Sequence, residues 1–371
     1  MLPYSSNELS KGIEVSHEFF PIKKVAQIFS VTQNDLLHLV QTNKIPPFQR
    51  HRHGVIEKKG WFADDLFEIG KVCGFFQPFG APKAVAVFTT KGGVLKSTLA
   101  TNLARIAALH GMKTCVVGLD IQGDITSALG HDPLENGNDD NMGELIEQLD
   151  QTKGLYDIFN SQSRIEETIL ATDLPNLYLI PETPELVALN EAISNINRRE
   201  YWLKEKIVDR LKKNFDLVIM DCSPNWNKLT TNALVACDAL ISPIECKINN
   251  FRNFRVFRHF LNEFKEDMRL DFTNIMVPTR YSPSRKLSMD IKEWYYQNVE
   301  NCLPIGIKES IIGEEAMALN KSIIEHAPAH KVTAEVKQVF QYIHEYISNT
   351  EAKESFQNYH TGSEERPWHL A

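Results

Sequence analysis

A lysine and a hydroxyl side chain stand next to each other near the end of the octet KGGVLKST, residues 91–98. Gly92 and Gly93 allow a tight backbone turn that brings N–H groups against phosphate oxygens. Lys96 supplies a point charge for the phosphates, and Ser97 supplies a hydroxyl for a bound Mg²⁺. These residue types at this spacing predict a binding site for ATP and Mg²⁺. A glycine turn with incidental lysines is the alternative.

The elements around the octet must hold it at the edge of a sheet. Residues 84–88 form a continuous apolar run rich in valine, which is typical of a strand buried on both faces. Residues 99–109 have helical periodicity, Gly111 ends that helix, and residues 114–119 form the next buried strand. This order predicts an α/β fold with a doubly wound, mainly parallel sheet and the nucleotide at the carboxyl ends of its strands.

The octet differs from the ordinary phosphate loop, because Thr90 and Leu95 stand where that pattern has glycine. It fits KGGxxK[ST], and here it resembles the deviant Walker A loop of the ParA/MinD family of P-loop ATPases. The resemblance implies that Lys96 serves the chain's own nucleotide and that Lys91 reaches the phosphates held by a partner subunit in a homodimer. Most members carry glycine in place of Leu95. The expected nucleotide contacts are Lys91, Gly92, Gly93, Val94, Leu95, Lys96, Ser97 and Thr98.

An aspartate follows the second predicted strand in LDIQGDITSALG. This segment resembles the family's switch segment, usually DxDPQGNATSGLG, which implies that Asp120 orients the attacking water. Gly118, Ile121 and Asp124 replace the first aspartate, the proline and the asparagine, so we expect weak intrinsic hydrolysis. The alternative for Asp120 is a helix cap or turn residue. The implied catalytic set is Lys91, Lys96 and Asp120.

A second aspartate, Asp221, ends the apolar strand in FDLVIMDCSPNW, residues 215–226. The segment resembles the family's YDYIIIDTPPS, which implies that Asp221 and Ser97 hold Mg²⁺. A turn residue is the alternative. Further on, IMVPTRYSPSR resembles the strand and loop that carry base-pocket contacts in this family, so Pro278 and Arg280 are candidates for the adenine side.

The N-terminal part has the pattern of a helix-turn-helix followed by a wing. Apolar residues repeat at helical spacing over residues 22–29, and Thr32 with Asp35 forms a capping box for a second helix that reaches about Asn43. The second helix offers polar side chains suited to base edges, and the basic turn QRHRHG suits a phosphate backbone. The segment resembles winged-helix modules of the MerR type. The expected DNA contacts are Gln33, Asn34, His38, Arg50 and Arg52, and the alternative is a small helical dimerisation domain.

Basic side chains also recur in the predicted ATPase part. FRNFRVFRHFLNEF places Arg252 and Arg255 on one helical face, beside a row of phenylalanines. Together with Lys321 and Lys331 they are candidates for nonspecific DNA contact, whose energy would come from counterion release. An amphipathic helix with a solvated basic edge is the alternative.

Composition limits the class of protein. The chain has 371 residues and a net charge of −8, which argues against indiscriminate nucleic-acid binding over the whole surface. No apolar run approaches the ~18 residues of a membrane span, and no signal peptide is recognisable, so we expect a cytoplasmic protein without membrane contact. The resemblance to the ParA/MinD family further implies that it associates with the nucleoid. The six cysteines form no CxxC pair, which indicates reduced packing thiols.

These patterns predict an N-terminal winged helix-turn-helix or dimerisation region over residues 1–76, a linker over 77–83, a ParA-type ATPase domain over 84–350 and a polar tail over 351–371. The resemblance implies an ATP-dependent DNA partition ATPase that dimerises with ATP on nonspecific DNA. It further implies stimulation by a ParB-like centromere-binding partner and repression of its own operon. The alternatives are a transcriptional regulator that uses ATP as a conformational ligand and a MinD-like positioning ATPase. A reductase of the related iron-protein type would need bridging cysteines, and no suitable pair is present.

Overall fold

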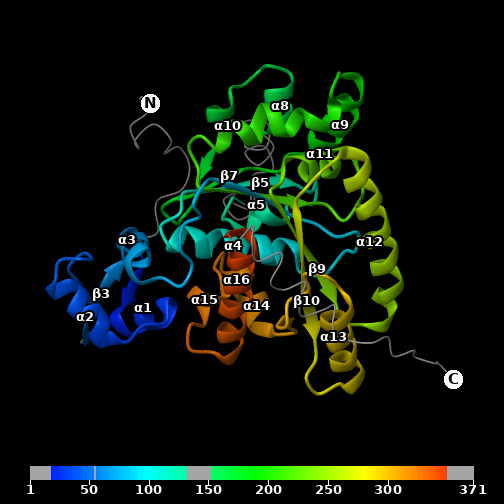
Figure 1. The fold of residues 1–371 in the computed structure, drawn as a ribbon. Coiled ribbons are helices and arrows are strands. Elements are labelled where there is room, and N and C mark those ends of the chain that lie inside the picture. Colours follow the sequence, from blue (N-terminus) through cyan, green and yellow to red (C-terminus); the bar gives the residue numbers. More distant parts are fainter. Residues whose placement is uncertain (1–17, 54–55, 132–151, 349–371) are drawn as a thin grey trace, which may run out of the picture.

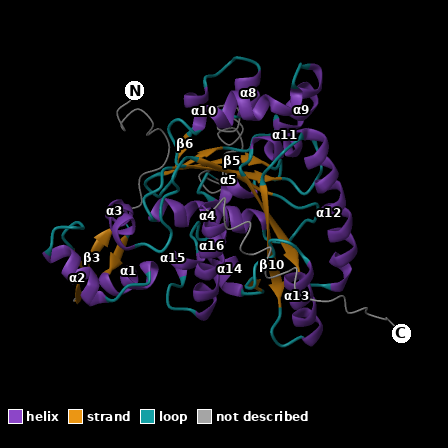
Figure 2. Cartoon of the chain, viewed as in Figure 1, coloured by secondary structure: helices purple, strands orange, loops and turns teal. Residues whose placement is uncertain are grey.

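The computed structural model describes residues 18–53, 56–131 and 152–348, so the predicted polar tail lies outside the described residues. A twisted sheet lies between two layers of helices, and a smaller N-terminal module packs at one end (Figures 1 and 2). The strands of the large sheet are β4 (Lys83–Val87), β5 (Thr114–Leu119), β6 (Leu170–Ala171), β7 (Leu177–Ile180), β8 (Leu217–Cys222), β9 (Ala239–Glu245), β10 (Thr273–Tyr281) and β11 (Ile307–Lys308).

The described strands of this sheet follow the order β11-β10-β9-β4-β8-β5-β7-β6. All neighbouring pairs are parallel except β6 and β7, which are antiparallel. The predicted α/β fold with a mainly parallel sheet is therefore confirmed. The strand before the octet begins one residue earlier than predicted, at Lys83, and β5 has the predicted bounds.

Strand β4 explains why its sequence is apolar without interruption. Val85 and Val87 belong to the apolar core on one face of the sheet, whereas Ala84 and Ala86 belong to the core on the other. Successive side chains of a strand point to opposite faces, and helices cover both faces here. Because both faces of this central strand are buried, its sequence does not alternate between apolar and polar residues.

The helices divide between the two faces. Residues of α4, α14, α15 and α16 belong to the core that contains Val85, and residues of α8, α9, α11, α12 and α13 belong to the core that contains Ala84. The helices are α4 (Lys96–Leu109), α5 (Asp124–Ala128), α8 (Leu155–Phe159), α9 (Leu186–Ala192), α10 (Asp209–Leu211), α11 (Lys228–Ala236), α12 (Ile248–Met268), α13 (Lys286–Asn298), α14 (Ile311–Ala318), α15 (Ile323–His326) and α16 (Lys331–Ser348). Short helical turns cover residues 165–167, 193–195, 199–201 and 204–208.

The N-terminal module contains the two predicted helices, whereas residues 49–53 of the predicted basic turn form strand β2 of an antiparallel pair. The capping box is confirmed, since Thr32 Oγ1 accepts from the Asp35 amide and Asp35 accepts from the Thr32 amide. The second helix ends at Gln41, two residues before the predicted end. The elements are β1 (Phe19–Pro21), α1 (Ile22–Phe29), α2 (Gln33–Gln41), β2 (Gln49–His53), β3 (Ile56–Phe62) and α3 (Ala63–Cys73), with β2 and β3 antiparallel.

The N-terminal module shares one apolar core with α4 and α16. The contact between α3 and α4 is close, because a Cβ on Gly70 would lie 2.1 Å from the carbonyl oxygen of Leu109. Lys337 of α16 donates to the Ser30 hydroxyl at 2.9 Å and to the carbonyl of Gln27. The division at residues 77–83 stays a prediction, but the two parts are packed against each other.

The cysteines agree with the prediction of packing thiols. All six are unpaired, five are buried and Cys73 is half-buried. Within the described ranges, no group of His, Cys, Asp or Glu side chains has the arrangement of a metal-binding cluster. None of the described helices combines the length and apolarity that a membrane crossing requires.

Candidate nucleotide site

The loop between β4 and α4 turns through two residues with left-handed backbone. Gly93 has a φ of 69° and Leu95, which caps α4, has a φ of 72°. A Cβ on Gly93 would meet nothing closer than 3.9 Å, so the backbone conformation and not space requires glycine there. Leu95 adopts a conformation that costs an L-residue about 1 kcal/mol. The departure from the family's usual glycine is therefore a strained position.

The two lysines of the octet are placed differently. Lys96 lies in the first turn of α4, is 7% exposed, and donates through Nζ to the carbonyl of Lys91 at 3.3 Å. The side chain of Lys91 is exposed at the front of the loop. One ammonium group therefore lies inside the site and the other at its rim.

Two side chains of strand β10 donate hydrogen bonds to the backbone of the phosphate loop. Arg280 Nη1 donates to the carbonyl of Gly93 at 2.8 Å, and its Nη2 donates to Glu309 at 3.2 Å. The hydroxyl of Thr279, which lies between the two base-side candidates, donates to the carbonyl of Val94 at 3.3 Å. Of the two base-side candidates, Arg280 thus contacts the loop backbone, and Pro278 is buried within the strand.

Asp221 is a buried carboxylate without a hydrogen-bond partner. It is fully buried at the end of β8, and neither of its oxygens accepts a hydrogen bond. Burial raises the pKa of Asp221 to about 7, although the nearby Ser97 hydroxyl and Lys96 ammonium lower it. The residues present fit a magnesium ion, because Asp221 and Ser97 offer the oxygen ligands that Mg²⁺ takes directly or through water.

Asp120 lies at the end of the neighbouring strand. The residue two before it, Gly118, is the register partner of Asp221, because β5 pairs with β8. The Asp120 side chain is 6% exposed and accepts from the Gln122 amide at 3.2 Å. Burial raises the pKa of Asp120. The fold thus brings the two predicted aspartates to the same edge of the sheet as Lys96.

A third carboxylate lies at this edge, although no motif in the sequence predicted it. Glu182 follows β7 and accepts hydrogen bonds from the backbone amides of Asp120 at 3.2 Å and Thr126 at 3.3 Å. Burial raises the pKa of Glu182 well above its ordinary value, and the Asp221 carboxylate adds to the shift. A signal was present, since Glu182 comes shortly after the apolar run LYLI, as Asp120 and Asp221 follow theirs.

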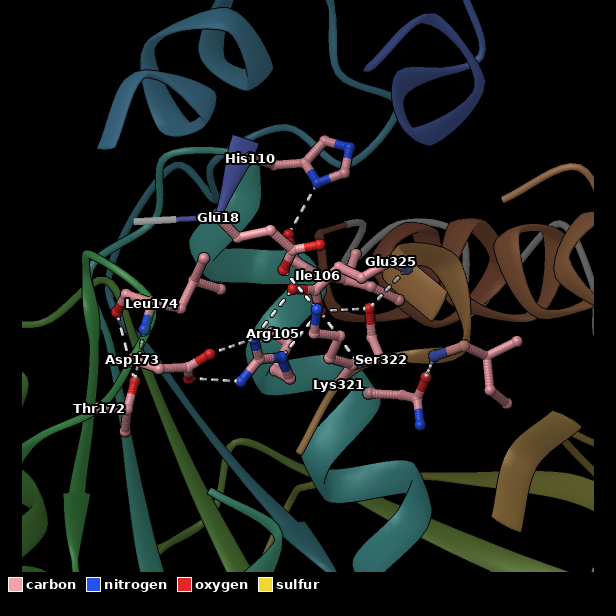
Figure 3. Close-up of polar contacts among 12 residues, drawn as sticks. Glu18, Arg105, Ile106, His110, Thr172, Asp173, Leu174, Lys321, Ser322 and Glu325 are labelled. Atoms are coloured by element: carbon pink, nitrogen blue, oxygen red, sulfur yellow. Dashed lines mark hydrogen bonds and ion pairs between the residues drawn. The ribbon is translucent and has the colours of Figure 1, made fainter. Parts of the chain in front are cut away.

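The helix that starts at the phosphate loop is anchored by a buried ion network (Figure 3). Arg105 of α4 donates to Glu325 of α15 at 2.7 Å and to Asp173 at 2.8 Å. Burial opposes ionisation of Glu325, but Arg105 lowers the pKa of that carboxyl to about 2. Lys321, a predicted DNA contact, lies just before α15 and pairs with Glu18 of the N-terminal module. This contact therefore joins the two parts of the chain.

The predicted base-reading residues lie on the N-terminal module. Gln33, Asn34 and His38 lie on α2, and all three are exposed. Arg50 and Arg52 are exposed on β2, where Arg50 forms an ion pair with Glu57 of β3 at 3.1 Å. This module therefore carries exposed polar side chains on α2 and exposed basic side chains on β2.

The remaining predicted DNA contacts lie on the larger part. Arg252 and Arg255 are exposed on α12, and Lys331 is exposed at the start of α16. Phe254 and Phe257 of α12 are buried and hold this helix against the sheet. In Figure 1, α12 and α2 lie on opposite sides of the molecule. The arginines of α12 and the polar side chains of α2 therefore lie on separate surfaces.

The AAA_31 family, described as an AAA domain, matches residues 82–274, a range that contains the octet, Asp120 and Asp221. The chain belongs to this family. It is 33% identical over 165 residues to the sporulation initiation inhibitor protein Soj of Bacillus subtilis, covering 44% of this chain and 59% of that protein. It is 29% identical over 189 residues to the chromosome partitioning protein ParA of Myxococcus xanthus, covering 51% and 61%. The chain thus spans about three fifths of the length of these relatives.

Solved structures support the same fold. A plasmid partition protein from Borrelia burgdorferi has a TM-score of 0.53 at 23% identity, with 70% of this chain and 98% of that one covered. A complex of Cyanothece McdA with ATP has a TM-score of 0.59 at 16% identity, covering 71% and 96%. Cobyrinic acid a,c-diamide synthase from Mycobacterium smegmatis, solved with ADP and magnesium, has a TM-score of 0.56 at 22% identity, covering 71% and 94%. At these identities the likeness concerns the P-loop NTPase fold.

Proposed function

We propose that this chain is a ParA-type DNA partition ATPase that forms ATP-bound homodimers on nonspecific DNA. A ParB-like centromere-binding protein stimulates its hydrolysis, and it works in the cytoplasm on the nucleoid. The observation that carries the proposal is the unpartnered, buried carboxylate of Asp221 beside Ser97 and Lys96. Such a group costs stability when nothing binds it, so it suits a ligand ion better than a structural role.

Each loop residue has a separate task in this proposal. Lys96 neutralises the phosphates of the chain's own ATP, and the exposed Lys91 reaches the phosphates of a second copy. Asp221 and Ser97 hold Mg²⁺, which when bound neutralises charge on the β- and γ-phosphates. Asp120 orients the attacking water. The hydrolysis rate is slow without the partner protein, because Gly118, Ile121 and Asp124 differ from the family's usual switch segment.

Two DNA-binding modes follow from the two separate surfaces. The N-terminal module reads its own operator through the polar and basic side chains of α2 and β2 and represses its operon. Nonspecific binding uses Arg252 and Arg255 of α12 and Lys331 of α16, all of which are exposed. Lys321 joins them only when its ion pair with Glu18 opens.

The main experiment measures binding of the full-length chain to random-sequence duplex DNA with ATP, with ADP and without nucleotide. We expect binding with ATP and Mg²⁺ only, and a steep loss of affinity as salt rises, because binding releases counterions. Arg252→Glu should weaken binding more than Arg269→Glu, which makes the same charge change at the far end of the same helix. Binding that ignores the nucleotide, or an equal loss in both variants, would rule out this nonspecific mode.

A transcriptional regulator that uses ATP only as a conformational ligand is the second candidate. One observation favours it: the N-terminal module packs against α4, the helix that starts at the phosphate loop. The two functions differ in their need for hydrolysis. If the chain is a partition ATPase, Asp120→Ala should abolish stable inheritance of a low-copy plasmid that this chain segregates. If the chain is only a regulator, the same variant should keep operator control and leave plasmid inheritance unchanged.

A further inference from the structure

Glu182 lies at the carboxyl edge of the sheet although no nucleotide-loop motif contains it. It follows β7, and its side chain is buried next to the segment that begins at Asp120. Its neighbour along the chain, Glu185, is exposed. A buried carboxylate is destabilising unless hydrogen-bond donors satisfy it, so the contacts of Glu182 need a physical reason.

Those contacts join Asp120 to Thr126 within the switch segment, residues 119–130. Oε1 of Glu182 accepts from the Asp120 amide at 3.2 Å, and Oε2 accepts from the Thr126 amide at 3.3 Å and the Thr126 hydroxyl at 3.2 Å. The Glu182 amide in turn donates to the Thr126 hydroxyl at 2.9 Å. One carboxylate therefore fixes both the residue after β5 and the first turn of α5.

Because Gly118 of β5 has no side chain, the Glu182 side chain can occupy the space next to it. A Cβ on Gly118 would lie 2.2 Å from Cγ of Glu182 and 3.2 Å from its Oε1, so a side chain at position 118 and the present Glu182 exclude each other. The switch segment that this chain resembles has an aspartate at the position of Gly118. In this chain, the space beside Asp120 is filled by a carboxylate that comes from the loop after β7 instead of from β5.

We infer that Glu182 is a positioning residue for Asp120, and that its carboxylate replaces one that would otherwise stem from position 118. The inference rests on the proposed ATPase function, in which Asp120 orients water. Glu182 acts through the backbone of the switch segment, because both of its oxygens accept hydrogen bonds from that segment. Its loss should therefore impair turnover more than ATP binding.

The first test needs no nucleotide. Amide hydrogen exchange of the full-length chain should be faster at Asp120, at Thr126 or at both in Glu182→Gln than in wild type. The two N–H groups bind different carboxylate oxygens, and glutamine has an NH2 donor in place of one of them. Glu185→Gln is the matched control, and it should leave both amides unchanged. Equal exchange in wild type and Glu182→Gln would overturn the inference.

The second test moves the carboxylate back to β5. Glu182→Ala should lower kcat by roughly tenfold to a hundredfold, with KM for ATP nearly unchanged, because a misplaced catalytic group slows the chemical step. Gly118→Asp combined with Glu182→Ala should restore most of that loss. Gly118→Asn combined with Glu182→Ala fills the same space without the charge, and it should not restore turnover.

These variants separate positioning from space filling. If the double variant with Gly118→Asn restored kcat as well as the one with Gly118→Asp, Glu182 would only fill space and the inference would be wrong. An unchanged kcat in Glu182→Ala would also overturn it. If the wild type itself showed no ATP turnover, the proposed function would fail, and the hydrogen-exchange comparison would still decide whether Glu182 holds the switch segment.

Discussion

Arg280 of β10 donates through Nη1 to the backbone carbonyl of Gly93 at 2.8 Å, across 187 positions of sequence. The same guanidinium reaches Glu309 at 3.2 Å, so its planar group connects the phosphate loop to the segment after β11. The carbonyl that accepts from Arg280 belongs to a glycine with a φ of 69°. The loop geometry therefore depends on a strand far away in the chain.

Removal of this contact should loosen the phosphate loop. Arg280→Ala should weaken ATP binding by roughly tenfold, because one charge-assisted hydrogen bond that orders the loop is lost. Isothermal titration with a nonhydrolysable ATP analogue measures the effect. Arg285→Ala is the control, since Arg285 is exposed a few residues further on. Equal affinities in the two variants would show that Arg280 does not order the loop.

The two lysines of the octet should behave differently. Lys96→Ala should abolish ATP binding, because the buried ammonium of the site is lost. Lys91→Ala should keep most of the affinity but prevent the ATP-dependent dimer and hydrolysis, since Lys91 lies exposed at the rim. Nucleotide titration and light scattering measure binding and dimerisation. An equal loss of binding in both variants would argue against a role for Lys91 across a dimer interface.

Leu95 offers a test of backbone strain. Its left-handed conformation is less strained for glycine than for alanine, so Leu95→Gly should be more stable than Leu95→Ala by about 1 kcal/mol in urea unfolding. Leu287, exposed in the first turn of α13, is the control position. There the order should reverse, because glycine weakens a helix relative to alanine. If alanine were more stable than glycine at position 95 as well, Leu95 would not be strained.

His110 should make stability depend on pH. It is buried among Phe29, Phe75 and Phe76, and burial lowers the pKa of His110 to about 4, with Lys337 and His344 adding to the shift. The unfolded chain binds this proton near pH 6.5 and the folded chain only near pH 4, so stability is full above pH 6.5 and falls as pH drops toward 4.

His110→Asn keeps a side-chain donor for the Ile106 carbonyl, which His110 Nδ1 contacts at 2.7 Å, but it cannot titrate. The free energy of unfolding should therefore fall less between pH 6.5 and 4 in this variant than in wild type, by up to about 3 kcal/mol. Urea unfolding at several pH values measures both slopes, and the comparison cancels the contributions of other histidines. Parallel slopes would contradict the prediction.

Several features of this chain were determined by local sequence. The valine-rich run before the octet, the capping box of Thr32 and Asp35, and the apolar strand before Asp221 each depend on residues close together in the chain. Periodicity and capping act over one or two turns, so they can be read without knowing the fold. The mainly parallel sheet followed from the same alternation of strands and helices and was confirmed.

Other features were decided only by the tertiary structure. Arg280 meets Gly93, Glu182 fills the space beside Gly118, and Lys321 pairs with Glu18, because the order of the strands and the packing of the N-terminal module bring distant segments together. No local pattern encodes such contacts. A side chain's partner across the sheet depends on which strands are neighbours and in which register they pair, and these are properties of the whole core.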